Sequence, residues 1–154
     1  MIHLDRVSKR YRAGKDGLRG VSLSVGEGAL VFVTGHSGAG KTTLLRLIPG
    51  LERPSGGRLS VAGMAVDRLP RRKLPQLRQR VGVTFQDHRL LPDRTVFENV
   101  ALPLAIAGLP PREAARRVRA ALDKVGLLAK EQAYPVTLSG GEQQRVGIAR
   151  AVVG

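Results

Sequence analysis

The sequence is poor in several kinds of residue, and each shortage narrows what the chain can be. It has no cysteine, so disulfides and thiolate metal sites are excluded, as is common in a reducing compartment. It has no long apolar run either, because the longest, at residues 100–109, is interrupted by Pro103 and falls short of the roughly 18 residues that span a bilayer. Residues 1–6 lack the apolar region of a signal peptide. We therefore expect a soluble, cytoplasmic protein that meets the inner face of the cell membrane only peripherally, through a partner or through surface charge.

Acidic residues are also scarce: 12 Asp and Glu stand against 26 Lys and Arg, which gives a formal net charge of +14. This balance suits polyanionic partners such as nucleotides, nucleic acids or anionic lipid surfaces. Two basic clusters stand out, one with Arg68, Arg71, Arg72, Lys73, Arg78 and Arg80, the other with Arg112, Arg116, Arg117 and Arg119. A charge run fixes no geometry, so solvated helix faces are the simplest interpretation, and contact with lipid or nucleic acid stays a lesser hypothesis.

Glycine and proline divide the chain into short apolar runs and helical patterns, which favours an α/β architecture in one domain. Residues 29–34 form a continuous β-favouring run between glycines, as in a strand buried on both faces, and residues 81–85 form a similar run. Residues 1–7, 21–25 and 58–62 predict a small antiparallel sheet. The β part of the fold is therefore expected to be mixed.

The helical patterns dominate from Thr95 onward, and we expect a helical subdomain at about residues 90–150. An earlier helix is predicted at residues 42–48, where Pro49-Gly50 stops it. In the second half, Pro110-Pro111 precedes an amphipathic run that ends near Gly126. A last helix should begin at Ser139, because Ser139 and Glu142 have the spacing of a capping box.

The strongest motif is a glycine-rich loop between a predicted buried strand and a predicted helix. Residues 35–42 read Gly-His-Ser-Gly-Ala-Gly-Lys-Thr and satisfy the P-loop pattern, in which backbone N–H groups point at phosphate oxygens. We expect Lys41 to reach the β- and γ-phosphates and the Thr42 hydroxyl to ligate Mg²⁺. For His36 we expect packing in the loop rather than chemistry. The predicted nucleotide-binding residues are Gly35, His36, Ser37, Gly38, Ala39, Gly40, Lys41, Thr42 and Thr43.

A second motif narrows the class of P-loop protein. Residues 138–145, Leu-Ser-Gly-Gly-Glu-Gln-Gln-Arg, resemble the signature motif of the ABC ATPase family. In that family the segment binds the γ-phosphate of a nucleotide held by the P-loop of the opposite subunit, so the resemblance implies a homodimer. The chemistry agrees, since a Ser139 hydroxyl beside two glycine N–H groups and a helix start can form an anion site. An ordinary helix cap is the alternative.

The resemblance assigns roles to two more residues. Gln86 matches the family's Q-loop glutamine, which ligates Mg²⁺ and senses the γ-phosphate, with a buried structural glutamine as the alternative. Tyr11 matches the aromatic residue that stacks on adenine, with simple packing as the alternative. The implied cofactors are ATP and Mg²⁺. The implied catalytic residues are Lys41, Gln86, Ser139 and Gly141, and the implied metal ligands are Thr42 and Gln86.

Further matches lie outside the nucleotide chemistry, at residues 85–88, 93–96, 99–101 and 141–152. They resemble the branch of the family that acts in bacterial cell division, where the ATPase docks on an FtsX-type membrane protein and its ATP cycle regulates peptidoglycan hydrolysis. The resemblance implies that residues 87–99 receive this partner, with Leu90 and Leu91 as apolar contacts. ATPases of lipoprotein export or macrolide efflux are the nearest alternatives. A truncated nucleotide-binding protein without hydrolysis and a basic nucleic-acid-binding module are alternatives from other classes.

Members of this family continue past the signature helix with an apolar strand that ends in Asp-Glu, then a D-loop and a switch histidine. Here only residues 151–154 follow Arg150. The Asp would orient Mg²⁺, the Glu would polarise the attacking water and the His would contact the γ-phosphate. We therefore expect residues 1–154 to be a single incomplete nucleotide-binding domain of the P-loop, ABC ATPase type, without the C-terminal part of the fold. It should hydrolyse ATP at background and aggregate through the unpaired edge of residues 29–34.

Overall fold

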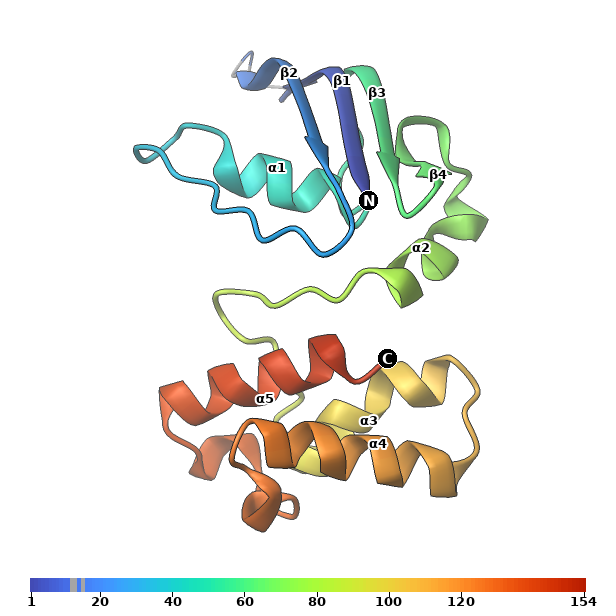
Figure 1. Ribbon diagram of the computed structural model, residues 1–154. Coiled ribbons are helices and arrows are strands. Elements are labelled where there is room, and N and C mark those ends of the chain that lie inside the picture. Colours follow the sequence, from blue (N-terminus) through green and yellow to red (C-terminus); the bar gives the residue numbers. More distant parts are fainter. Residues whose placement is uncertain (12–13, 15) are drawn as a thin grey trace. The chain divides into compact units, whose positions relative to one another are not determined.

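The computed structural model describes residues 1–11, 14 and 16–154, which divide into two compact units, residues 1–81 and residues 82–154 (Figure 1). Each unit contains its own cluster of buried apolar side chains. The first unit is built on a β-sheet and the second is helical. Within the described residues no helix is long and apolar enough to cross a membrane.

The first unit is an antiparallel sheet in the order β2-β1-β3-β4, as the sequence predicts for its first three strands. The strands are β1 (Ile2–Arg10), β2 (Asp16–Val25), β3 (Gly56–Val61) and β4 (Met64–Ala65). Strict alternation would place Leu4 and Val7 of β1 on opposite faces. A register shift between them, where Arg6 has φ 47°, lets both side chains lie buried in one core.

Helix α1 (Lys41–Leu47) covers one face of this sheet and buries Leu44 and Leu47 in its core (Figure 1). It begins one residue before the predicted start. It ends at Leu47, one residue before the predicted end and ahead of the predicted stop at Pro49-Gly50. Gly50 has φ 65°, and its N–H donates to the Leu47 carbonyl at 3.0 Å. The short turns η1 (Val66–Arg68) and η2 (Arg71–Lys73) then lead into α2 (Leu74–Arg80), which is anchored by fully buried Leu77.

Two strand predictions are wrong for this structure. Among the described residues, neither 29–34 nor 81–85 forms a strand or pairs with one. Leu30 and Phe32 are 82% and 80% exposed. A strand exists only where a neighbouring strand accepts and donates its backbone hydrogen bonds, so apolar composition alone did not suffice.

The second unit packs three helices, α3 (Val96–Ile106), α4 (Pro111–Lys124) and α5 (Gly140–Val152), with short turns η3 (Leu128–Lys130) and η4 (Pro135–Thr137) between them. The amphipathic run after Pro110-Pro111 and the helix start at Ser139 are confirmed. Capping boxes begin α3 and α5, formed by Thr95 with Glu98 and by Ser139 with Glu142. The core of this unit comprises Val96, Val100, Leu104, Val118, Leu122, Leu127, Val146 and Ala149, among others.

Candidate nucleotide-binding site

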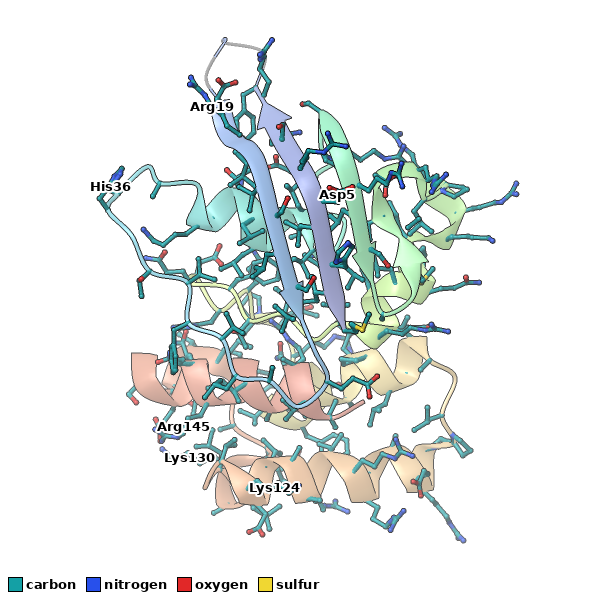
Figure 2. All side chains as sticks on the ribbon, turned by 45° about the horizontal axis from the view of Figure 1, so that its top comes forward. Asp5, Arg19, His36, Lys124, Lys130 and Arg145 are labelled. Carbon is teal, nitrogen blue, oxygen red and sulfur yellow. The ribbon has the colours of Figure 1, made fainter. Side chains whose placement is uncertain are left out.

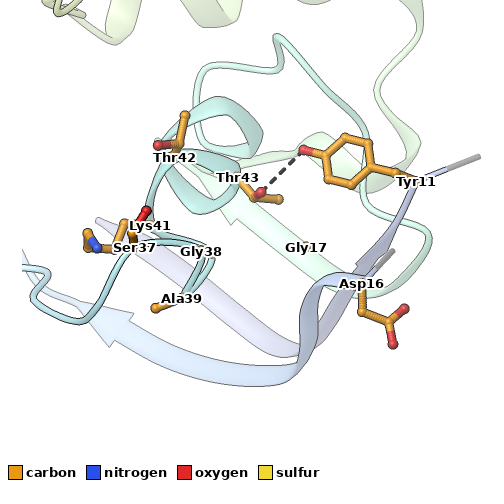
Figure 3. Close-up of a pocket in the computed structure, with 10 residues that line it drawn as sticks. Tyr11, Asp16, Gly17, Ser37, Gly38, Ala39, Lys41, Thr42 and Thr43 are labelled. Atoms are coloured by element: carbon orange, nitrogen blue, oxygen red, sulfur yellow. Dashed lines mark hydrogen bonds between the residues drawn. The ribbon is translucent and has the colours of Figure 1, made fainter. Parts of the chain in front are cut away.

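The glycine-rich loop, the start of α1, Tyr11 and the first residues of β2 line a pocket of about 560 Å³ in the first unit (Figure 3). Its volume falls in the usual range of small-molecule sites. The loop and the first turn of α1 contribute every residue from Ser37 to Thr43. The other lining residues are Tyr11, which directly follows β1, and Asp16 and Gly17, which begin β2. The structure thus brings Tyr11 to the predicted P-loop, although about thirty residues separate them in sequence.

The loop conformation depends on three glycines. Gly35, Gly38 and Gly40 have φ values of 148°, 83° and 92°, which side-chain-bearing residues rarely adopt. Of these three glycines, Gly40 alone packs against the backbone of another segment: a Cβ atom added there would lie 2.4 Å from the carbonyl oxygen of Gly17. The turn into α1 therefore rests directly on the first residues of β2.

The Lys41 side chain reaches back across the loop to the residues that begin it. Its Nζ donates to the carbonyl oxygens of Gly35 at 2.6 Å and His36 at 2.8 Å, so the ammonium group lies across the turn. The first turn of α1 contains no acidic residue that would repel a phosphate. The arrangement provides one fixed positive charge together with the backbone N–H groups of a glycine-rich turn, which is a chemistry suited to a polyphosphate.

The two threonines that follow Lys41 have different surroundings. Thr42 is exposed, so its hydroxyl is accessible to a ligand at the pocket. Thr43 is buried, and its Oγ1 lies 3.2 Å from the Tyr11 hydroxyl (Figure 3). The described residues contain no cluster of three or more His, Asp or Glu that could hold a metal ion by themselves. An exposed hydroxyl beside a phosphate site fits Mg²⁺, which usually takes one or two protein ligands and completes its shell with phosphates and water.

Tyr11 is held in place on several sides. Besides the Thr43 contact, the ring lies so close to Gly17 that a Cβ atom there would be 2.7 Å from Tyr11 Cε2. Lys9 Nζ lies 5.3 Å from the ring centroid, within the range of a cation–π interaction. These contacts orient an aromatic side chain at the pocket wall, where it can meet a planar base.

Sequence reasoning missed two residues of this wall, Asp16 and Gly17. Arg10 and Arg19 donate to the Asp16 carboxylate at 3.3 and 2.6 Å, and these hydrogen bonds lower its pKa below the ordinary value. No motif marks either residue, because both reach the pocket only through the pairing of β2 with β1.

His36 behaves differently from the expectation of loop packing. It is exposed at the outer end of the loop, where Figure 2 labels it, and its Nδ1 lies 2.8 Å from the Ser37 carbonyl oxygen. Neither His36 nor Gly35 lines the pocket that Tyr11 and Lys41 share. His36 therefore contributes local turn geometry rather than a packed side chain.

The other predicted site residues, Gln86, Ser139 and Gly141, lie in the second unit. Gln86 is exposed, so the alternative of a buried structural glutamine does not fit. Ser139 does make the helix cap: its Oγ accepts from the Glu142 N–H at 3.3 Å, while Glu142 accepts from the Ser139 N–H at 2.9 Å. Gly140 and Gly141 are exposed at the same helix start. The cap and an anion site at this terminus are thus compatible.

The segment after Gln86 is held by the far end of the signature helix, a contact that sequence reasoning also missed. His88 and Arg89 have φ values of 54° and 45°, an unfavourable conformation for residues with side chains. The Arg150 guanidinium donates to both of their carbonyl oxygens at 2.8 Å, and burial lowers its pKa. One helix therefore begins at the signature motif and ends on the loop that follows Gln86.

The capping box at α5 predicts a pH dependence of stability. Hydrogen bonds from Lys130 and from the Ser139 N–H lower the Glu142 pKa from 4.5 to about 2. Because the folded-state pKa is depressed, the carboxylate stabilises the fold fully above about pH 4.5 and loses this contribution as the pH falls to about 2. The difference in unfolding free energy between the parent chain and Glu142→Gln should be constant above that window and disappear below it, as measured by denaturant titration at stepped pH.

A second variant controls for the cause. Lys130→Met removes the largest contribution to the depressed pKa, so the loss of stability on acidification should still begin near pH 4.5 but should be smaller and end at a higher pH than in the parent chain. If the parent chain and Glu142→Gln lost stability in parallel between about pH 4.5 and pH 2, the pH dependence would not arise from Glu142.

Comparison with known proteins places these features in context. The family model described as "ABC transporter" matches residues 18–154. The cell division ATP-binding protein FtsE of Escherichia coli K12 is 57% identical over 99% of this chain and 69% of its own length, and FtsE of Haemophilus influenzae is 49% identical over 99% of this chain and 71% of its own length. The methionine import ATP-binding protein MetN 2 of Burkholderia mallei is 55% identical, but over 88% of this chain and 34% of its own length.

Solved structures agree with the sequence comparisons. Two dimeric structures of the bacterial ABC transporter cassette MJ0796 superpose with TM-scores of 0.92 and 0.91, at 35% and 34% sequence identity, over 99% of this chain and 69% of theirs. One of them is a post-hydrolysis state bound to ADP and inorganic phosphate. The similarity therefore covers both the sheet unit and the helical unit of the chain.

Proposed function

Because the chain belongs to the ABC transporter family, whose cassettes bind ATP, we propose that it is the ATPase component of a membrane-associated complex of the FtsE–FtsX type in bacterial cell division. The observation that carries this proposal is the 57% identity to E. coli FtsE across 99% of the chain. The second FtsE relative also matches over 99% of this chain. In this role, ATP binding and hydrolysis would regulate peptidoglycan hydrolysis at the division site.

The pocket of the first unit supports ATP with Mg²⁺ as the ligand. The loop N–H groups and Lys41 would bind the phosphates, and Tyr11 would stack on the adenine. Thr42 and Gln86 would ligate Mg²⁺, which when bound neutralises charge on the β- and γ-phosphates. The remaining loop residues, Gly35, His36, Ser37, Gly38, Ala39, Gly40 and Thr43, would shape the turn around the phosphates.

A homodimer would complete the site. The MJ0796 cassettes are dimeric, and in this chain the exposed glycines at the start of α5 leave a helix terminus open to a partner. We place Ser139 and Gly141 at the γ-phosphate of the opposite copy, where N–H groups and a hydroxyl would stabilise charge that develops during transfer. Ser139 can do so while its hydroxyl still accepts the cap hydrogen bond.

Hydrolysis needs groups that residues 1–154 do not include. No Asp-Glu pair follows α5 in the printed sequence, and the chain spans 69% of its E. coli relative. We infer that a polypeptide of these residues alone forms an incomplete nucleotide-binding domain that binds ATP without appreciable turnover, since the groups that orient Mg²⁺ and polarise water supply much of the rate.

The membrane partner is proposed to dock on residues 87–99, which would hold the chain peripherally on the inner face of the membrane. Asn99 fixes this segment, because its side chain bonds to both the N–H and the carbonyl of Leu91. The Leu91 side chain is 39% exposed, whereas Leu90 packs partly against the helical core. Leu91 is therefore the better of the two predicted contacts to test.

The experiment is co-purification of the chain with an FtsX-type membrane protein. Leu91→Asp should reduce recovery of the partner at least tenfold while ATP binding is retained, because a charge replaces an apolar contact distant in sequence from the P-loop. Ile106→Asp is the matched control, since Ile106 is 63% exposed in the same unit and lies outside residues 87–99. Equal recovery with Leu91→Asp would contradict the docking proposal.

A methionine-import role is the second candidate, favoured by the 55% identity to MetN 2. That match covers less of the chain than the FtsE match does. The same co-purification separates the two, because recovery of an import permease in place of an FtsX-type protein would favour the second role.

A further inference from the structure

The basic segment, defined as residues 68–80, presents positive charge that carboxylates leave largely uncompensated. It runs from the end of η1 through η2 and α2. Arg71, Arg72 and Lys73 form the turn η2 and are all exposed. Within the part of the chain that the structure describes, these three side chains make no ion pair or hydrogen bond.

The acid beside the segment is already engaged. Asp67 accepts the Leu59 N–H at 3.1 Å through Oδ1, and its Oδ2 lies 3.8 Å from Arg68. Arg78 and Arg80 donate to the carbonyl oxygens of Gly50 and Ala62, which leaves their charge without an anion. Their guanidinium groups are thus positioned by the fold and remain positive.

The second basic cluster, on α4, has a different chemistry. Arg116 and Arg117 both bond to Glu113, at 3.0 and 2.9 Å, and Arg119 bonds to Glu131 at 2.9 Å. The two clusters look alike in sequence, but on α4 three of the four arginines pair with an acid of the same unit, and Arg112 is the one without an ion pair among the described residues. In the basic segment, by contrast, Arg71, Arg72 and Lys73 are adjacent in the chain and none of them has an ion pair in the described part of the chain.

The fold also fixes the direction of the basic segment. Leu77 is fully buried and Leu74 packs against the core of the first unit, so α2 is anchored by its apolar side. The other α2 positions, from Pro75 to Arg80, are exposed apart from Leu77. These exposed cations are spread along the whole segment. Such a surface attracts an extended polyanion rather than a single small anion.

We propose that the basic segment binds the surface of an anionic lipid bilayer. An anionic membrane surface attracts Lys and Arg without requiring a shaped pocket, which suits charges spread over two short turns and a short helix. Nucleic acid fits less well: residues 56–81 contain no aromatic side chain on which bases could stack, and α2 has seven residues, too few to read a groove. The choice of bilayer rests in part on the proposed role at the membrane.

The test is sedimentation of the chain with vesicles of phosphatidylglycerol and phosphatidylcholine, with no membrane protein present. Each basic residue near such a surface contributes about a fivefold gain in affinity, so Arg71→Gln, Arg72→Gln and Lys73→Gln together should weaken binding at least tenfold. The matched control, Arg112→Gln, Arg116→Gln and Arg117→Gln, removes the same number of charges and should change binding by less than about threefold. Thermal unfolding verifies that both triple variants fold.

The outcomes are distinct. The proposal is supported if only the first triple variant loses binding to vesicles that contain phosphatidylglycerol, and if the parent chain does not bind pure phosphatidylcholine vesicles. Equal loss in both variants would mean that net charge alone matters and would overturn it, as would absence of vesicle binding. Tighter, equally selective binding to duplex DNA would assign the segment to nucleic acid instead. The vesicles hold no protein, so a negative result in this assay does not bear on the proposed docking of the membrane partner. A negative co-purification likewise does not affect the measurement of lipid binding.

Discussion

Replacing Gly40 by alanine should weaken ATP binding by about a hundredfold or more. The residue has φ 92°, where a side chain costs roughly 1–2 kcal/mol. The added Cβ would also lie 2.4 Å from the Gly17 carbonyl oxygen, so either the loop or the start of β2 must move. Overpacking of this kind adds about 1–3 kcal/mol, and the sum corresponds to a loss of that order in affinity. Equilibrium binding of a fluorescent ATP analogue measures it.

Gly28→Ala is the control for backbone strain. Gly28 has φ 71°, but a Cβ atom there meets nothing within 4 Å, and the residue lies outside the pocket. This variant should lose stability by the strain alone and bind the nucleotide almost as the parent chain does. If Gly28→Ala and Gly40→Ala weakened ATP binding equally, the contact between the loop and β2 would not be responsible.

Replacing Asn99 by aspartate should destabilise the helical unit by about 3 kcal/mol or more at neutral pH, although the two side chains have nearly the same shape. Asn99 is completely buried. Its Oδ1 accepts the Leu91 N–H at 2.8 Å, and its Nδ2 donates to the carbonyl oxygens of Leu91, Arg94 and Thr95 at 3.1, 3.1 and 2.9 Å. Aspartate would direct a second oxygen at three carbonyl oxygens in a site that also disfavours its charge.

Denaturant unfolding followed by circular dichroism measures the loss, with two variants for comparison. Asn99→Ala should cost somewhat less than Asn99→Asp, since it removes the bonds without adding a buried acceptor. Gln143→Ala, which removes a partly buried amide that donates to two carbonyl oxygens, should cost about 1 kcal/mol. A mild effect of Asn99→Asp would show that the amide does not hold the loop.

These two results bear on different parts of the proposed function. Gly40 tests whether the phosphate loop depends on its contact with β2, and Asn99 tests whether the proposed docking segment depends on a buried side chain of α3. Motif spacing identifies Gly40 as a P-loop residue but does not reveal its contact with β2, and no motif marks the side chain of Asn99. Both owe the size of their predicted effects to atoms that lie nearby only in the folded chain.

The sequence by itself determined the features that depend on neighbours along the chain. The P-loop pattern at residues 35–42, the α1 helix after it and the capping box at Ser139 are local, because their hydrogen bonds join residues a few positions apart. The same holds for the amphipathic α4, whose apolar spacing predicted its buried face.

Only the tertiary structure decided what depends on distant segments. The strand predictions at residues 29–34 and 81–85 failed because a strand needs a partner that composition does not supply. Tyr11 meets Thr43, Gly17 meets Gly40 and Arg150 meets His88 through chain separations of more than twenty residues. The two basic clusters were indistinguishable as sequence. Only the placement of Glu113 and Glu131 showed that Arg116, Arg117 and Arg119 are paired with acids whereas, within the described residues, Arg71, Arg72 and Lys73 are not, since compensation of charge depends on distance in space.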